Sequence, residues 1–170
     1  MEQPFISGVS QDLSEAKITV TAVPDRPGEA ALVFETLADL GVNLDMIVQN
    51  VSADGSTDIT FTLPTADLGS ASAALLARQG EIGFGELLQD EGIAKVSLVG
   101  AGMRSHPGVS ATFFRTLADA GVNVEMISTS EIRISVVTRA EDAAKAVQAL
   151  HSSFGLDAEG EAVVYAGTGR

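Results

Sequence analysis

The chain has 170 residues, of which 45% are hydrophobic and 19% are charged, a composition typical of a globular protein with a buried core. Its 23 acidic and 10 basic residues leave a net charge of −13, which repels phosphate and anionic lipid and argues against nucleic acid or a membrane surface as a partner. The absence of cysteine excludes thiol nucleophiles, thiolate metal sites and disulfides.

The first residues carry neither a basic leader nor a long apolar run, and no stretch approaches the roughly 20 apolar residues that a membrane-spanning helix needs. We therefore expect a cytoplasmic protein. The chain also repeats itself at an offset of eighty positions, because residues 27–47 and 107–127 share a Pro-Gly pair, a Thr-Leu-Ala-Asp segment, a Gly-Val-Asn turn and a Met-Ile pair. This indicates two copies of one supersecondary unit.

In chain order, residues 5–10 are a short extended segment that can add a strand. Residues 16–22 and their counterpart 94–99 alternate apolar and polar side chains, which predicts half-buried strands. A helix is expected to begin at each Pro-Gly pair, 27–28 and 107–108, and to end at Gly41 and Gly121. The apolar stripes expected to face a sheet are Ala30, Val33, Phe34, Leu37 and Leu40 in one helix, and Ser110, Phe113, Phe114, Leu117 and Ala120 in the other.

The second half of each copy continues with strands at 43–51 and 123–130 and with alternating strands around 59–63 and 132–136, the former preceded by an Asp54-Gly55 turn. Ala-rich helices follow at 66–79 and 140–153, and extended pieces at 84–90 and 161–166 end the copies. Each copy thus reads β-α-β-β-α-β. The predicted fold class is α+β, with two ferredoxin-like units in tandem, each an antiparallel sheet with helices on one face and with free edges that favour side-by-side pairing.

Catalytic and metal chemistry find little support in the residues. No nucleophile–base pair or carboxylate dyad stands out, so an enzyme in its own right is the weakest hypothesis. His106 and His151 have no companion ligands for a metal site. The glycines of residues 100–103 resemble a dinucleotide loop only in part, because Ser105 takes the place of its third glycine. The acidic segment 54–58 is better interpreted as a hairpin turn than as a calcium loop.

Several longer motifs resemble the ACT domain, an amino-acid-sensing module, and above all the paired ACT domains of aspartokinase. The motifs that carry this resemblance are Val48-Gln49-Asn50-Val51-Ser52, Thr57-Asp58-Ile59-Thr60-Phe61, Lys95 to Met103, His106-Pro107-Gly108-Val109, Ile127 to Val136 and Val163-Val164-Tyr165. The resemblance implies ACT domains at 15–90 and 91–170, the second completed by residues 5–10. It also implies a regulatory subunit or regulatory segment of aspartate kinase, without catalysis of its own, because neither the kinase domain nor a phosphate-binding loop is present.

An amino-acid effector needs receptors for its carboxylate and its ammonium group. Backbone N–H groups at a helix N-terminus can bind the carboxylate. Two segments lie at such ends: Asp25, Arg26, Pro27, Gly28, Glu29 and Ala30, and residues 106–110, in which Val109 and Ser110 are the expected contacts. The ammonium group can be bound by Asp25, or by carbonyls of the turns Asn43, Leu44, Asp45 and Asn123, Val124, Glu125, with Gln49 adding a polar contact. From the residues alone, Pro-Gly pairs are more often simple helix starts, and asparagines after glycine are more often turn formers than ligand contacts.

The resemblance implies that the Pro-Gly loop of one ACT unit faces the Asn turn of another. One site then contains residues 25–30, Gln49, Asn123 and Val124, and the other contains residues 43–45, Val109 and Ser110. The sites are expected to differ, since Asp25 aligns with no acid and Gln49 aligns with Thr129. Thr129 and the neighbouring Ser130 are also expected to contact an effector. We expect threonine in the first site and lysine or nothing in the second, no cofactor, a homodimer formed through the ACT domains, and the aspartokinase catalytic (alpha) subunit as partner. The alternative is a dimerisation scaffold that binds no effector.

Overall fold

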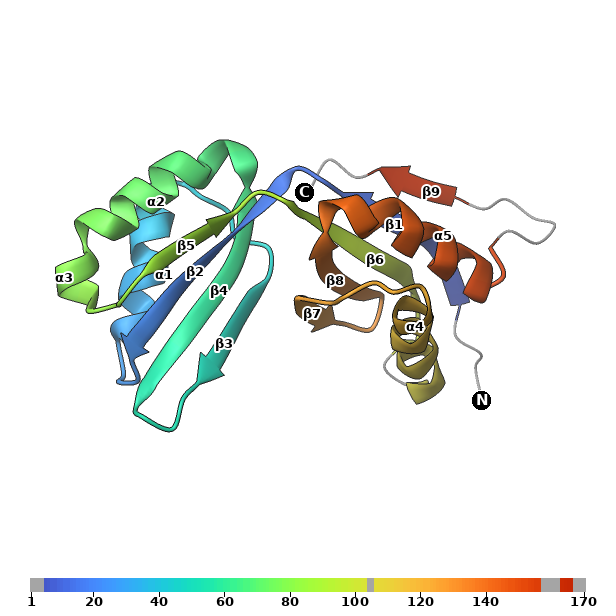
Figure 1. Cartoon of the computed structure of the whole chain (residues 1–170), viewed down its shortest axis with the longest axis horizontal. Helices are drawn as coiled ribbons and strands as arrows, with labels where there is room; N and C mark the ends of the chain where they lie inside the picture. Colours follow the sequence, from blue (N-terminus) through green and yellow to red (C-terminus); the bar gives the residue numbers. More distant parts are fainter. Residues whose placement is uncertain (1–4, 104–105, 157–162, 167–170) are drawn as a thin grey trace. The chain divides into compact units, whose positions relative to one another are not determined.

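The computed structural model describes residues 5–103, 106–156 and 163–166 (Figure 1). These residues form two compact units. One unit is continuous in sequence, Ser14–Glu91, and we call it the central unit. The other, the split unit, consists of the described residues of Met1–Leu13 and Gly92–Arg170.

The central unit contains, in chain order, β2 (Glu15–Pro24), α1 (Glu29–Asp39), β3 (Ile47–Val51), β4 (Ser56–Pro64), the 3-10 helix η1 (Thr65–Asp67), α2 (Leu68–Ala77), α3 (Gln79–Ile82) and β5 (Leu87–Asp90). Its four strands lie in the order β3-β4-β2-β5, and every neighbouring pair is antiparallel. This is the predicted β-α-β-β-α-β arrangement, with the first strand inside the sheet and the helices on one face (Figure 1).

The core of the central unit lies between this sheet and its helices. Ile18 and Val20 of β2 and Phe61 of β4 are buried against Leu37 of α1, as the alternating strand pattern predicts. Leu40 is the exception on the predicted helix stripe, because α1 ends at Asp39 and the Leu40 side chain is 46% exposed.

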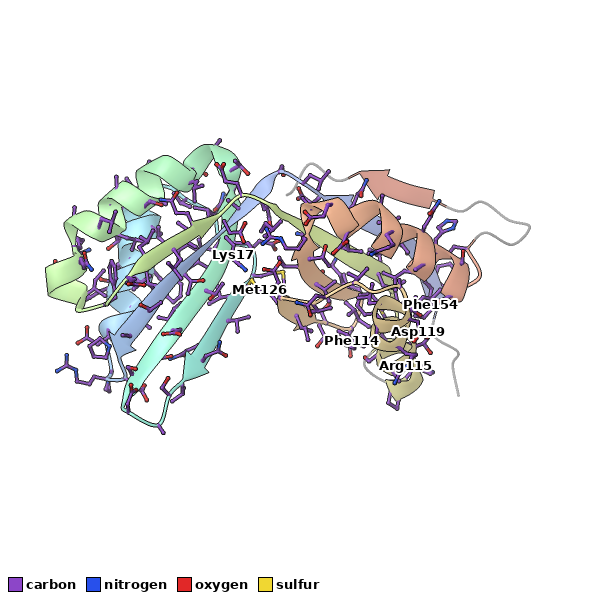
Figure 2. All side chains as sticks on the ribbon, viewed as in Figure 1. Lys17, Phe114, Arg115, Asp119, Met126 and Phe154 are labelled. Carbon is purple, nitrogen blue, oxygen red and sulfur yellow. The ribbon has the colours of Figure 1, made fainter. Side chains whose placement is uncertain are left out.

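The split unit contains β1 (Phe5–Asp12), β6 (Ile93–Ala101), α4 (Pro107–Asp119), β7 (Met126–Thr129), β8 (Arg133–Arg139), the 3-10 helix η3 (Ala140–Asp142), α5 (Ala143–Ser153) and β9 (Val163–Ala166). Its strands lie in the order β7-β8-β6-β1-β9. Phe113 of α4 is fully buried in its core, and Phe114 and Phe154 pack against the rim of that core (Figure 2).

The two units differ in the strand beside the first strand of the repeat. In the central unit that place belongs to β5, the last strand, which pairs antiparallel with β2. In the split unit β1 takes it, pairing antiparallel with β6 from Phe5 opposite Ala101 to Asp12 opposite Lys95. The last strand, β9, therefore pairs outside β1 and runs parallel to it. The predicted fold class is confirmed, and the parallel β9 is the departure from purely antiparallel pairing.

Candidate functional site

The loop before α1 is the first part of the candidate site. Gly28 caps α1 in the left-handed conformation, with φ of +95°, and no side chain in the described parts of the chain caps this helix end. The Glu29 N–H donates to the Arg26 carbonyl (3.3 Å) and the Arg26 guanidinium lies 3.2 Å from the Glu29 carboxylate. The first-turn N–H groups of Ala30 and the following residue have no intrahelical acceptor, so this end can bind a carboxylate.

This loop is attached to the neighbouring hairpin by a backbone hydrogen bond from Asp25 N–H to the Gly55 carbonyl, 2.9 Å long. The hairpin turn is itself stabilised by Asp54, whose carboxylate accepts from the hydroxyl of Ser56 (2.6 Å) and from its backbone N–H (3.0 Å). The Ser56 hydroxyl, followed by this N–H, lowers the pKa of the Asp54 carboxyl below its ordinary value, which keeps the turn in its charged, hydrogen-bonded form.

Asn43, Leu44 and Asp45 lie at the other end of α1. The helix ends through Gly41, which has φ of +70°, and through the Val42 N–H, which donates to the Leu37 carbonyl. Because α1 has 11 residues, its two ends are about 16 Å apart, so one unit does not bring its Pro-Gly loop and its Asn turn together. Within a unit, the two segments therefore cannot contact the same small ligand.

Gln49 lies on the edge strand β3, where the register places it opposite the buried Ile59. Directly opposed residues share a face of the sheet, so Gln49 is on the face that α1 covers. Its side chain is exposed because β3 is an edge strand. Val48 and Asn50 are on the opposite face. Gln49 is thus placed to contact a molecule bound on the helix side of the sheet.

The corresponding part of the split unit contains a cavity of about 320 Å³ beside the start of α4. Three of the predicted site residues, Ser110, Thr129 and Ser130, contribute to its lining. Pro107 belongs to the helix start that the sequence indicates, whereas the sequence did not place the other two lining residues, Met103 and Ile134, in a site. Met103 follows the glycine-rich segment and Ile134 alternates into the core, so both carry the sequence signal of a buried position rather than of a ligand contact.

Val109 and the second Asn turn lie at opposite ends of α4 in the split unit. The Val109 side chain is part of the core and its N–H donates to the His106 carbonyl (3.0 Å), so Ser110 and Gly108 present the more accessible backbone of this helix start. Asn123 and Val124 follow Gly121 at the far end of α4, as in the central unit, and Val124 packs against the core.

The two helix starts differ in charge. The central loop carries the charged side chains of Asp25, Arg26 and Glu29, whereas hydroxyls, a thioether and aliphatic groups line the cavity of the split unit. Within the parts of the chain that the structure describes, no group of three or more His, Cys, Asp or Glu side chains is placed to hold a metal ion. In the same parts, no helix is both long and apolar enough to cross a bilayer.

Comparisons with known proteins point to one family. Residues 18–78 and 96–154 match the sequence model of a family described as ACT domain. Aspartokinase of Mycobacterium tuberculosis strain H37Rv is 58% identical over 173 residues, a match that covers 100% of this chain and 41% of that protein. The chain thus spans about two fifths of the length of the curated relatives that it matches.

Solved structures show the same relation. The regulatory subunit of aspartate kinase from Thermus thermophilus, in its ligand-free form, superposes with a TM-score of 0.84 at 43% identity, covering 88% of this chain and 99% of that one. Escherichia coli aspartokinase III in complex with lysine and aspartate superposes with a TM-score of 0.68 at 25% identity, covering 89% of this chain and 34% of that one.

Proposed function

Because this chain belongs to the ACT domain family and is the regulatory part of an aspartokinase, we propose that it binds a free amino acid as an effector and transmits that signal to the catalytic part of the enzyme. The observation that carries this proposal is the helix start at Gly28, which no described side chain caps and whose backbone N–H groups can bind a carboxylate. In the proposed site Asp25 binds the ammonium group of the same amino acid, and the Gln49 side chain adds a polar contact. The proposed setting is the cytoplasm.

The proposed effector is threonine, bound where the Pro-Gly loop of one ACT unit meets the Asn turn of another, and its role is feedback inhibition of aspartate-family amino-acid synthesis. Lysine, which is bound by the related Escherichia coli aspartokinase III, is the alternative effector. Among the residues that the structure describes, those lining the cavity at Ser110 carry no carboxylate for a lysine ammonium group, which favours an unequal pair of sites.

The size of the effect can be bounded. A metabolite affinity of roughly 10 µM to 1 mM corresponds to about 4 to 7 kcal/mol of binding free energy. A coupling of about 1 to 3 kcal/mol to the catalytic part is a fraction of that, and is enough to change an equilibrium affinity there about fivefold to more than a hundredfold. The binding free energy of the effector is therefore large enough to supply the coupling free energy.

The edge of the central sheet supports association between chains. Ile47 and Val51 on β3 are 53% and 67% exposed, which is a large apolar exposure for an unpaired edge strand. We therefore propose a homodimer formed through ACT domains, and the aspartokinase catalytic subunit as the further partner. The same observation supports the alternative function, a scaffold that joins catalytic subunits without sensing an amino acid.

The test is inhibition of aspartate kinase activity in the enzyme reconstituted from this chain and a catalytic subunit. We expect threonine to inhibit saturably, and Gln49→Ala or Gly28→Asp to raise the half-inhibitory concentration about tenfold, as the loss of one polar contact or the obstruction of the loop would do. The matched control is Gln89→Ala on the other edge strand, β5. The enzyme with this variant should have the same half-inhibitory threonine concentration as the enzyme with the unmodified chain. If threonine inhibited all variants at the same concentration, the proposed site at Gly28 and Gln49 would be contradicted. If the reconstituted enzyme were stable and active but no amino acid inhibited it, the alternative function as a scaffold would be favoured.

A further inference from the structure

Strand β2 contains a left-handed residue that is not glycine. Ala22 has φ of +53°, and among the described residues other than glycine no other φ is positive. L-residues with a side chain are strained in this region because Cβ approaches the following carbonyl oxygen. Ala22 lies in a β-bulge, since Val20 is opposite Ile59 but Val23 is opposite Thr57. A strained residue at this point requires something that stabilises it.

The bulge determines which side chains of the following segment face the core. It turns Ala22 outward and places Val23 in the core, fully buried, where regular pairing would place Ala22. Pro24 then pairs with Ser56, and the Asp25 N–H reaches the Gly55 carbonyl. The start of the loop 25–28 is therefore set by the conformation of Ala22.

Asp58 on β4 holds this conformation directly. Its carboxylate oxygen Oδ1 accepts the Ala22 N–H at 2.9 Å. The preceding residue, Thr21, is fixed from the other side, because its N–H donates to the Glu86 carbonyl and its hydroxyl accepts the Glu86 N–H, both at 2.9 Å. Asp58 thus provides a side-chain acceptor for the backbone N–H of the strained residue itself.

The second copy of the repeat reaches the same conformation without such a carboxylate. Ala22 lies five positions before Pro27, and Gly102 lies five positions before Pro107, so Gly102 is the corresponding residue of the second copy. Gly102 is also left-handed, with φ of +69°, and the next residue, Met103, is buried. On the paired strands, Asp58 precedes the core residue Ile59 in β4, whereas Arg133 precedes the corresponding core residue Ile134 in β8. A glycine adopts this φ without strain. An acid at position 58 therefore accompanies the alanine at position 22, whereas an arginine at position 133 accompanies the glycine at position 102.

We propose that Asp58 is a positioning residue for the effector, which holds the left-handed Ala22 and thereby places the loop 25–28 for binding without touching the bound amino acid. This inference rests on the proposed function, because it assigns a cause to the geometry of the same half-site. The acceptor matters here rather than the charge, so an asparagine at position 58, whose amide oxygen also accepts, should retain the role.

The experiment measures threonine binding by titration calorimetry, and backbone amide exchange by NMR, on the full chain. We expect Asp58→Ala to weaken threonine binding tenfold to a hundredfold and to accelerate exchange of the Asp25 amide. Asp58→Asn should stay within about threefold of the unmodified chain, since it keeps an acceptor. The double variant Asp58→Ala with Ala22→Gly should recover most of the affinity and of the protection, because glycine needs no acceptor to remain left-handed.

The matched control is Arg133→Ala, at the corresponding position of the split unit, which should leave binding and Asp25 exchange unchanged. The proposal is overturned if Asp58→Ala binds and exchanges like the unmodified chain, or if the added glycine restores neither property. If the unmodified chain binds neither threonine nor lysine, the proposed function fails, but amide exchange still tests whether Asp58 positions the loop. Unchanged Asp25 exchange in Asp58→Ala would reject that role. Faster Asp25 exchange that Ala22→Gly reverses would support it.

Discussion

Single backbone angles distinguish the two copies of the repeat more clearly than their side chains do. Gly28 lies outside α1 as a left-handed cap, whereas Gly108 lies inside α4, one residue after Pro107. The sequence treats both Pro-Gly pairs alike and predicts a helix start at each. The structure differs because the central loop is attached to Gly55 through Asp25, which delays the start of α1 by two residues.

This difference predicts opposite effects of the same substitution. Gly28→Ala should lower the free energy of unfolding by about 1 to 2 kcal/mol, because alanine at φ of +95° is strained although no atom lies within 4 Å of the added Cβ. Gly108→Ala, also in open space but helical, should leave stability unchanged or raise it by up to about 1 kcal/mol. Urea unfolding of the two variants measures both effects, and equal destabilisation would contradict the assigned backbone conformations.

At the scale of elements, much of the arrangement follows from local pattern. Alternation in β2, β4, β6 and β8 and the helical stripes of α1 and α4 predict the sheet-on-helix layers, because burial repeats every second residue in a strand and every third or fourth in a helix. The Asn turns lie where the helix-ending glycines place them. The expected halves of a site, one at each end of a helix, follow from the same pattern.

Long-range pairing explains what local pattern did not predict. The bulge at Ala22 depends on Asp58, 36 residues away, and alanine itself has no preference for a left-handed conformation. The parallel pairing of β9 depends on β1, which lies more than 150 positions earlier in the chain and occupies the edge of β6. Met103 and Ile134 contribute to the cavity beside α4 although their sequence pattern indicates only core.

Attachment of β1 to the split unit leads to a prediction at Gly100. A Cβ added to this residue of β6 would lie 2.2 Å from the Phe5 carbonyl oxygen, so the first residues of β1 would have to move. We expect Gly100→Ala to cost about 1 to 3 kcal/mol of unfolding free energy and to increase amide exchange in β1. Gly69→Ala in α2, where nothing lies within 4 Å of the added Cβ, is the control and should be neutral or stabilising. Unchanged exchange in β1 would contradict the close pairing of these strands.

At the scale of the whole molecule, two ACT units in one chain offer two Pro-Gly helix starts and two Asn turns, which are the proposed halves of two effector sites. The halves are chemically unequal, with charged side chains before α1 and uncharged groups in the cavity beside α4. An amino acid that binds at only one kind of site would therefore be sensed with a stoichiometry below the number of ACT units.

Titration calorimetry of the purified chain with threonine, lysine and methionine in turn tests whether the chain binds an amino-acid effector. We expect saturable heat from threonine, with a dissociation constant of roughly 10 µM to 1 mM, and no saturable heat from methionine. Saturation at one threonine per chain would match the unequal half-sites. No saturable heat from threonine or lysine, either for the chain alone or with the catalytic subunit present, would contradict an effector-binding role.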